Sequence, residues 1–201
     1  MIALIDYGAG NLTSVKKALS FLGADFVVPA SPAELGGARG VIVPGVGHFA
    51  ATAALGGAWS DAIAQAVSAG KPLLGICLGM QWLFEGSDEA PAVRGLGVMR
   101  GRITRLKGDA EHRMKVPHVG WNALEFARPA RLLDGLSTGA QVYFTHSFAA
   151  PVTSDTVAAT THCATFASVV ERDNVFGVQF HPEKSSDVGL EMLRNFLGVC
   201  G

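Results

Sequence analysis

The sequence predicts an α/β fold, with an open, mostly parallel, doubly wound sheet and additional antiparallel strands in the C-terminal half. The first observation is that short apolar runs alternate with helical patterns through the first 80 residues. The second is composition: 49% of the residues are hydrophobic and 25 are glycines, which suits many tight turns between strands and helices. The third is a series of short, β-branched segments further along the chain. A length of 201 residues predicts one domain, residues 1–201.

The first half of the chain supplies the parallel part of the sheet. Strands are predicted at 1–7, 25–28, 40–43 and 73–76, and helices at about 12–22, 60–69 and 80–85. Strands that alternate with helices of this length pair in parallel through right-handed crossovers. In such open sheets the site lies at the carboxyl ends of the strands. Asp6, Gly45 and Cys77 all fall just past predicted strand ends.

The second half changes character after a charged loop at 86–95. Strands are predicted at 98–106, 122–126, 141–148, 157–163, 166–171 and 174–180, where they extend the sheet or form a small second one. An amphipathic helix at 187–197 closes the chain.

Composition excludes several classes of function. A net charge of −1 gives no electrostatic reason to expect nucleic acid or an anionic membrane as a partner. No apolar run approaches the roughly 20 residues that span a bilayer, and the N-terminus resembles a first strand and not a signal peptide. Three cysteines and six histidines lack the spacing of a disulfide framework or a metal site. We therefore expect a cytoplasmic protein without metal or cofactor.

The segment from Lys71 to Gln81 carries the first candidate catalytic residue. An apolar run leads directly to Cys77, which has Gly75 and Gly79 two positions away on either side. This is the glycine-flanked elbow between a strand and a helix, with cysteine as the nucleophile. A helix N-terminus at Cys77 would favour the thiolate. On this stretch alone, a small buried core cysteine fits equally well.

A thiolate nucleophile needs a base and a group that orients the base. His181 and Glu183 follow the predicted strand at 174–180. If this segment stays extended, residues two apart project to the same side, so that His181 faces Cys77 and Glu183 holds the imidazole. Considered alone, the two side chains also fit a strand cap and a solvated turn, and only the cysteine elbow on the same sheet edge favours the pair.

Acyl chemistry also needs donors for a developing oxyanion. The turn Gly45-Val46-Gly47 follows a buried strand, and its glycines let the peptide planes reorient. We assign one donor to this turn and a second to the N–H of Leu78; His48 is interpreted as structural.

Three motifs together resemble class I (triad-type) glutamine amidotransferases: the elbow Gly-Ile-Cys-Leu-Gly-Met-Gln, the turn Pro-Gly-Val-Gly, and Gly-Val-Gln-Phe-His-Pro-Glu-Lys. Three more are similar to the glutaminase subunits of imidazole glycerol phosphate synthase: Asp-Tyr-Gly-Ala-Gly-Asn-Leu, Val-Pro-His-Val-Gly-Trp-Asn and Tyr-Phe-Thr-His-Ser-Phe. They cover nearly the whole chain in the expected order. Two positions depart mildly from the pattern, Val119 for methionine and Phe148 for tyrosine.

The resemblance implies a flavodoxin-like, class I glutamine amidotransferase fold and hydrolysis of glutamine through a thioester on Cys77. It implies that glutamine is bound by Gly47, Gln81, Glu89, Thr145, His146 and Ser147. The assignment of Glu89 rests on a loose motif, and a solvated loop carboxylate fits as well.

The resemblance also implies a heterodimer with a (β/α)₈-barrel synthase subunit that receives the ammonia. Because the glycine turn at 45–47 is free to rotate, we hypothesise that the oxyanion hole is incomplete until this partner binds its ligand. The residues expected to face this partner are Asn11, Pro117, His118, Trp121, Tyr143 and Lys184. Without the resemblance, these are ordinary loop residues, and Trp121 would more often lie in a core.

Rival functions remain at this point. The nearest is the glutaminase subunit of another amidotransferase, serving anthranilate or pyridoxal phosphate synthesis, against which the N-terminal and Pro-His-Val-Gly-Trp motifs count. A hydrolase or deglycase-like enzyme on another substrate and a catalytically dead binding subunit are the others. Fold alone does not separate them.

Overall fold

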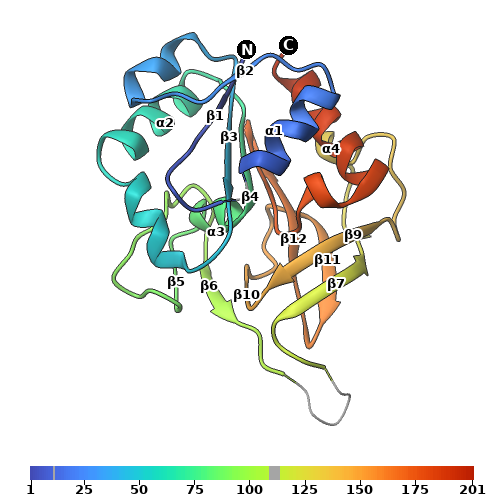
Figure 1. Ribbon diagram of the computed structural model, residues 1–201. Coiled ribbons are helices and arrows are strands. Elements are labelled where there is room, and N and C mark those ends of the chain that lie inside the picture. Colours follow the sequence, from blue (N-terminus) through green and yellow to red (C-terminus); the bar gives the residue numbers. More distant parts are fainter. Residues whose placement is uncertain (11, 109–113) are drawn as a thin grey trace.

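An eight-stranded sheet runs through the centre of the molecule (Figure 1). The computed structural model describes residues 1–10, 12–108 and 114–201. The strand order is β2-β1-β3-β4-β13-β12-β11-β8. The first five strands in this order pair in parallel: β2 (Phe26–Val27), β1 (Ile2–Leu4), β3 (Gly40–Gly45), β4 (Leu73–Cys77) and β13 (Val175–Val178). The last three are antiparallel: β12 (Ala164–Arg172), β11 (Thr156–His162) and β8 (Glu125–Phe126).

Helices cover both faces of this sheet (Figure 1). Successive side chains of its central strands point to opposite faces and all are buried, so each face needs a covering layer. On one face, Ile2, Leu4 and Ile42 belong to the core under α1 (Leu12–Phe21) and α4 (Ser186–Val199). On the other, Ala3, Val41 and Val43 belong to the core under α2 (Ala58–Ser68) and α3 (Leu78–Trp82). This second layer also contains the 3₁₀ helices η1 (Pro32–Gly37) and η2 (Phe49–Leu55).

Two smaller sheets flank the carboxyl ends of the parallel strands. One joins β10 (Phe148–Ala149), β6 (Arg102–Arg105) and β5 (Gly86–Ser87). The other is a two-stranded ribbon of β7 (His118–Ala123) and β9 (Gln141–His146), which we call the β7–β9 ribbon. Short 3₁₀ turns, η3 (Arg131–Leu133) and η4 (Pro182–Lys184), complete the fold. The predicted fold class is therefore confirmed, and the late strands both extend the main sheet and form smaller ones.

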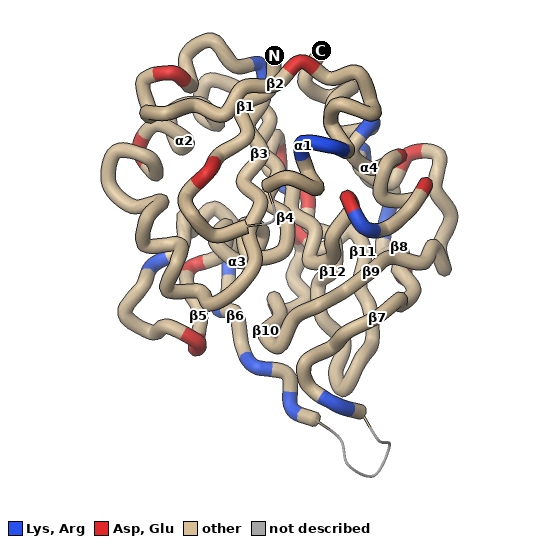
Figure 2. Tube along the Cα trace, in the orientation of Figure 1, with Lys and Arg blue, Asp and Glu red and all other residues tan. Residues whose placement is uncertain are grey.

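Charge is kept away from the centre of the main sheet. Strands β3 and β4 carry no charged residue and are uncharged along their whole length in Figure 2. Both are buried at every position, as expected for parallel strands covered on two faces. No helix among the described residues is long and apolar enough to cross a membrane.

Several predicted boundaries are wrong, each for a local reason. Strand β3 continues through Gly45, which was predicted to lie beyond it, because Gly45 pairs with Cys77. The elbow helix begins at Leu78 instead of 80 and ends at Trp82. Strand β7 begins at His118 instead of 122, because its register with β9 starts there.

Candidate active site

Cys77 ends β4 and lies immediately before the first residue of α3. Its backbone is in an unusual region with positive φ (φ 53, ψ −105), a strained conformation that occurs at nucleophile elbows. The flanking glycines are required by close packing: a Cβ on Gly79 would lie 1.8 Å from the carbonyl oxygen of Val43, and one on Gly75 would lie 2.6 Å from the carbonyl of Gly79. The sulfur is thereby presented at the edge of the sheet, in a residue that is only 5% exposed.

His181 and Glu183 form a buried pair beside this nucleophile. The Nδ1 atom of His181 lies 2.8 Å from Oε1 of Glu183, and each side chain is 2% exposed. Burial lowers the pKa of His181, but interactions of the imidazole with Cys77 and Glu183 outweigh burial and raise that pKa to about 10. The Nε2 atom makes no hydrogen bond of ordinary geometry within the described part of the chain. It is therefore free to exchange a proton with a neighbouring sulfur.

The backbone around His181 differs from the extended segment that was predicted. Pro182–Lys184 forms the 3₁₀ turn η4, and His181 caps it. The N–H of His181 donates to the carbonyl of Tyr143 (3.0 Å), and the hydroxyl of Ser185 donates to the carbonyl of His181 (2.7 Å). The predicted contact between His181 and Glu183 is present, but a tight turn and not strand alternation produces it.

A cavity of about 210 Å³ opens above the Cys77 elbow. It brings together segments that are far apart in the sequence: the turn after β3, the elbow, the loop after β5 and the end of β9. Its lining residues are Val46, Gly47, Cys77, Leu78, Gln81, Glu89, Pro117, Thr145, His146, Ser147 and Phe148. All the residues predicted to bind glutamine therefore lie around one cavity together with the predicted nucleophile.

The predicted oxyanion-hole residues divide into two groups. Val46, Gly47 and Leu78 line the cavity, and Gly47 has a positive φ of 104°. Gly45 does not line it, since it lies within β3. A Cβ on Gly45 would lie 2.0 Å from the hydroxyl of Tyr7 and 2.9 Å from Cβ of Leu78. Glycine at this position is thus needed for packing, which the sequence argument did not consider.

The polar groups of the cavity wall are held by further hydrogen bonds. The Gln81 amide donates through Nε2 to the carbonyl of Phe148 (2.9 Å) and to Oε1 of Gln179 (3.1 Å). Oε2 of Glu89 accepts from the N–H of Phe49 (2.8 Å), at the start of η2. Phe148 accepts the hydrogen bond from Gln81 with its backbone carbonyl. Phenylalanine in place of the more usual tyrosine at this position therefore does not affect that bond.

The residues predicted to face a partner have different surroundings. Trp121 is 54% exposed on the outer face of β7, with Val119 on the same face. Trp121 contacts the half-buried Tyr143 ring edge to face, with centroids 6.1 Å apart. The prediction that His118 faces a partner is wrong. His118 is 3% exposed, because the alternation of side chains along β7 turns it inward, where it stacks against Phe144. Asn11 lies outside the described residues.

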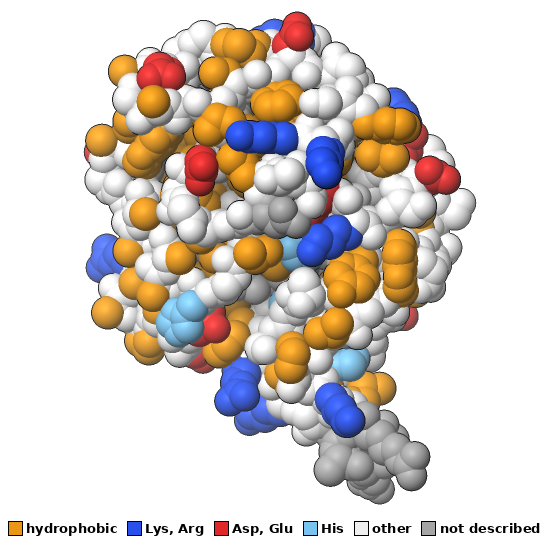
Figure 3. All heavy atoms as spheres, in the orientation of Figure 1, with side chains coloured by type: hydrophobic (Ala, Val, Ile, Leu, Met, Phe, Trp, Pro, Cys, Tyr) orange, Lys and Arg blue, Asp and Glu red, His pale blue; other side chains and the backbone are white. Residues whose placement is uncertain are grey.

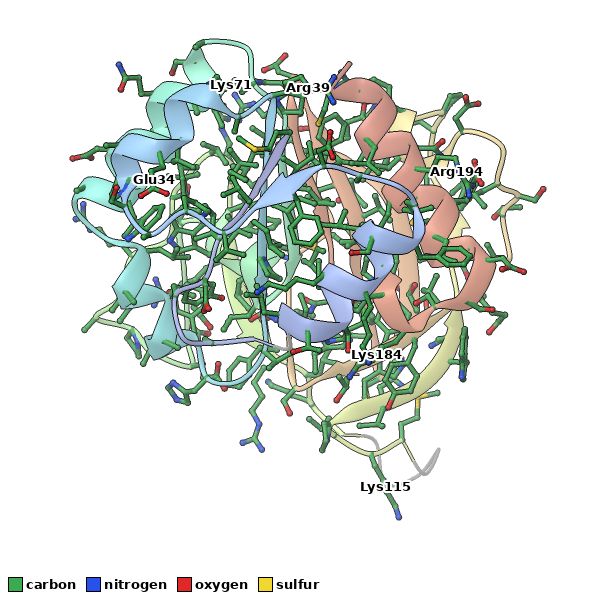
Figure 4. All side chains as sticks on the ribbon, turned by 45° about the horizontal axis from the view of Figure 1, so that its top comes forward. Glu34, Arg39, Lys71, Lys115, Lys184 and Arg194 are labelled. Atoms are coloured by element: carbon green, nitrogen blue, oxygen red, sulfur yellow. The ribbon has the colours of Figure 1, made fainter. Side chains whose placement is uncertain are left out.

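Lys184, another member of this set, is exposed. Figure 4 shows it on the same side of the molecule as Lys115, which precedes β7, and opposite the end that carries Arg39 and Lys71. In Figure 3, hydrophobic side chains gather on the surface over the β7–β9 ribbon. Pro117, which immediately precedes β7, also lines the cavity, which places the exposed surface next to the site.

Sequence reasoning missed two side chains that interact with Cys77. Nε2 of Gln179, which is 0% exposed, donates to Sγ of Cys77 over 3.7 Å. The Tyr7 hydroxyl is buried without a hydrogen-bond partner among the described residues, and burial together with the nearby Cys77 raises its pKa. The available signal was polarity in an apolar setting, since Gln179 interrupts the run from Val175 to Phe180.

Comparison with known proteins places this geometry in a family. The model of the family "Glutamine amidotransferase class-I" matches residues 3–199. A crystal structure described as glutamine amidotransferase has a TM-score of 0.76 and 22% identity, covering 100% of this chain and 98% of that chain. The structure of PurLQS from Thermotoga maritima has a TM-score of 0.73 and 17% identity, covering 98% of this chain and 97% of that one. At these identities the two structures support the fold.

Curated relatives are much more similar in sequence. "Imidazole glycerol phosphate synthase subunit HisH" of Geobacillus thermodenitrificans is 48% identical, covering 99% of this chain and 96% of that protein. The protein of the same description from Pyrococcus furiosus is 44% identical, covering 97% of both. The chain therefore belongs to the class-I glutamine amidotransferases and, within them, to the HisH subunits of imidazole glycerol phosphate synthase.

Proposed function

We propose that this chain is the glutaminase subunit of an imidazole glycerol phosphate synthase in histidine biosynthesis. It hydrolyses glutamine to glutamate and ammonia, and the ammonia passes to a (β/α)₈-barrel synthase subunit. The observation that carries the proposal is the cavity in which Cys77, the loop at Val46 and Gly47, and the polar groups of Gln81 and Glu89 meet. The descriptions of the relatives support the pathway assignment.

In the first half of the reaction, His181, whose pKa is raised, first takes the proton of the Cys77 thiol, and Sγ then attacks the carboxamide carbon of glutamine. The carbonyl oxygen becomes an oxyanion, for which the N–H groups of the Val46–Gly47 region and of Leu78 are the proposed donors. His181 then returns the proton to the departing nitrogen, so ammonia leaves and a glutamyl thioester remains. Glu183 supports the imidazolium through its 2.8 Å contact with Nδ1.

In the second half, water attacks the thioester carbon while His181 accepts one of its protons. The carbon–sulfur bond breaks, glutamate leaves, and the proton returns to the sulfur. Glu89 is the proposed partner of the ammonium group of glutamine. Its carboxylate is already oriented by the N–H of Phe49, and this bond leaves its other oxygen for the substrate.

Coupling to the barrel subunit is proposed to act through the turn that carries the oxyanion donors. Gly47 has a positive φ of 104°, and a Cβ there would meet none of the described atoms within 4 Å, so this peptide has room to reorient. Gly45, by contrast, is packed against Tyr7. Gly47 is therefore a better position than Gly45 at which to probe a reorientation of the turn.

The test measures glutamate release from glutamine by the purified chain, first alone and then with a barrel subunit and its ribotide ligand. Low basal release that rises with the partner and ligand supports both chemistry and coupling. Cys77→Ala should lower release by about a thousandfold or more, because it removes the nucleophile.

Two other outcomes would contradict parts of the proposal. Strong release that ignores the barrel subunit would keep the glutaminase and reject the histidine pathway. If no glutamate were released under any condition, the glutaminase assignment itself would be rejected. The remaining alternatives would be a hydrolase of another substrate and a catalytically inactive binding subunit.

A further inference from the structure

Gln179 links the nucleophile to the glutamine cavity from beneath the elbow. It directly follows β13, whose last residue, Val178, pairs with Ile76 just before Cys77. Its side chain is 0% exposed, and its backbone N–H donates to the carbonyl of Ser168 (2.9 Å). A fully buried amide must find hydrogen-bond partners, so the direction in which Gln179 points is determined by its neighbours.

The orientation of both amides follows from one fixed acceptor. The carbonyl of Phe148 can only accept, so the atom of Gln81 that lies 2.9 Å away is the amide nitrogen. The second hydrogen of that nitrogen is donated to Oε1 of Gln179, 3.1 Å away. The NH₂ group of Gln179 is thereby turned toward Sγ of Cys77, at 3.7 Å.

We propose that Gln179 is a positioning residue that donates an N–H to the sulfur of Cys77 and aligns it with His181. A sulfur that accepts this hydrogen bond uses a lone pair on the Gln179 side. Its own proton is then directed elsewhere, and Nε2 of His181 is buried without a partner among the described residues. After the proton moves, the same N–H bonds to a thiolate, and hydrogen bonds to charged groups are the stronger ones.

The arrangement also connects substrate binding with the nucleophile. Gln81 lines the cavity, while Gln179 lies below it, and one hydrogen bond joins their side chains. A bound glutamine that contacts Gln81 therefore also affects the orientation of the Gln179 amide, which donates to the sulfur of Cys77. The proposal rests on the proposed function for its substrate, but its effect on the sulfur is measurable without any glutamine.

The first experiment measures the rate at which iodoacetamide alkylates Cys77 as a function of pH, read at the Cys77 peptide by mass spectrometry. The titratable side chains His181 and Tyr7 interact with Cys77, Glu183 lies behind His181, and His146 and Glu89 line the same cavity. All five stay unchanged in the variants, and only Gln179→Glu adds a carboxyl group. Site-resolved reading separates Cys77 from Cys163 and Cys200.

Gln179→Met keeps the size of the side chain but removes both hydrogen bonds. We expect alkylation at neutral pH to slow by about tenfold or more, since a hydrogen bond to a charged group is lost. The midpoint of the alkylation–pH curve should move upward by about one pH unit. Gln179→Glu keeps an acceptor for Gln81 but turns an oxygen toward the sulfur, so an upward shift at least as large is expected, to which the negative charge of the carboxylate also contributes.

The two variants differ in glutamine turnover. Gln179→Glu should lower kcat while KM stays near the wild-type value, because Gln81 keeps its acceptor. Gln179→Met should lower kcat and raise KM together. Ser168→Ala is the matched control: it alters a buried polar side chain on the neighbouring strand β12 and should leave the alkylation curve unchanged.

The outcomes are distinguishable from failure of the proposed function. Slower alkylation with an upward-shifted midpoint supports the proposal even if no glutamine is turned over. A Gln179→Met protein that is folded by circular dichroism and alkylates like the wild type would overturn it, and Gln179 would then be only a core residue. If Gln179→Met does not fold, the same comparison is made with Gln179→Glu.

Discussion

Two neutral histidines form the inner wall next to the cavity, and their partners determine where each proton lies. Nδ1 of His146 lies 2.9 Å from the carbonyl of Phe148, so it carries a hydrogen, and its Nε2 accepts. Nδ1 of His118 donates to that Nε2 over 3.0 Å, and the amide of Asn122 donates to Nε2 of His118 over 3.3 Å. Each of the four ring nitrogens therefore has a hydrogen-bond partner. A charged imidazole has a hydrogen on both nitrogens and could no longer accept, so all four bonds form only while both rings are uncharged.

This arrangement predicts a loss of stability in mild acid. Burial lowers the pKa of His118 to about 3 and that of His146 to about 4. The unfolded chain takes up protons at both positions near pH 6.5, whereas the folded protein does not, so the stabilisation is complete above about pH 6.5 and declines as pH falls toward 4. Each histidine should contribute a slope of about 1.4 kcal/mol per pH unit in this window.

Urea unfolding between pH 4 and 8 measures the effect. His118→Asn should flatten the slope by about one histidine's share, about 1.4 kcal/mol per pH unit, whatever it does to stability at pH 8. His48→Asn, an exposed histidine whose Nδ1 accepts from the N–H of Ala50, serves as the control for removing a histidine. Equal slopes for wild type and His118→Asn would contradict the prediction.

The His181–Glu183 pair illustrates what sequence can and cannot predict about single residues. Residue types and motif order identified the pair, Cys77 and the cavity residues correctly as neighbours. The backbone argument for the pair was wrong, because Pro182 begins a 3₁₀ turn and does not continue a strand. The position of Gln179 in an apolar run marks it as unusual, but its contacts could not be predicted, since its partner Gln81 is 98 positions away and only folding brings the two amides together.

Among the elements, the contact between β3, β4 and α3 leaves the least room. A Cβ on Gly79 would lie 1.8 Å from the carbonyl oxygen and 2.8 Å from the carbonyl carbon of Val43, both backbone atoms of a buried central strand. A flexible side chain could move aside, but a strand paired on both sides cannot do so without losing its register with β1 and β4.

Gly79→Ala should therefore lower the free energy of unfolding by about 3 kcal/mol or more, or prevent folding. Gly198→Ala is the matched control, because Gly198 lies in α4 and a Cβ there meets none of the described atoms within 4 Å. Alanine in a helix is favoured over glycine, so this control should gain about 0.5–1 kcal/mol. Thermal unfolding of both variants measures the difference, and a Gly79→Ala protein as stable as the wild type would refute the packing argument.

Sequence predicted the elements of the main sheet better than those of the β7–β9 ribbon. Strands β3 and β4 are continuous apolar runs, a pattern that tertiary context does not override. Strand β7 instead begins at His118, directly after Pro117, and whether its side chains point inward or outward depends on its register with β9. Trp121, which composition alone would assign to a core, is exposed for the same reason.

For the whole molecule, the exposed face of the ribbon has the features of a docking surface for the proposed barrel subunit. Val119 is 57% exposed and Trp121 54%, next to a cavity mouth that Pro117 also lines. Aromatic residues are enriched among the side chains that dominate binding energy at interfaces. The prediction of a single domain stays a prediction, although both halves of the chain contribute strands to one sheet.

Trp121→Ala should weaken binding of the barrel subunit by about tenfold or more while leaving thermal stability nearly unchanged. Phe21→Ala is the control, since Phe21 is 75% exposed at the end of α1, away from the ribbon. Titration calorimetry with the barrel subunit compares the two variants with the wild type. If both variants bind as tightly as the wild type, the proposed surface is incorrect.

The position of β13 has a consequence for the order in which the protein becomes active. It is the last strand in the sequence, yet it is inserted between β4 and β12, next to the strand that ends at Cys77. During synthesis on the ribosome, every other strand leaves the exit tunnel before β13, and His181 and Glu183 follow it. A nascent chain, or one truncated before β13, thus carries Cys77 without His181. Such a chain should not hydrolyse glutamine until the final strand is inserted into the sheet.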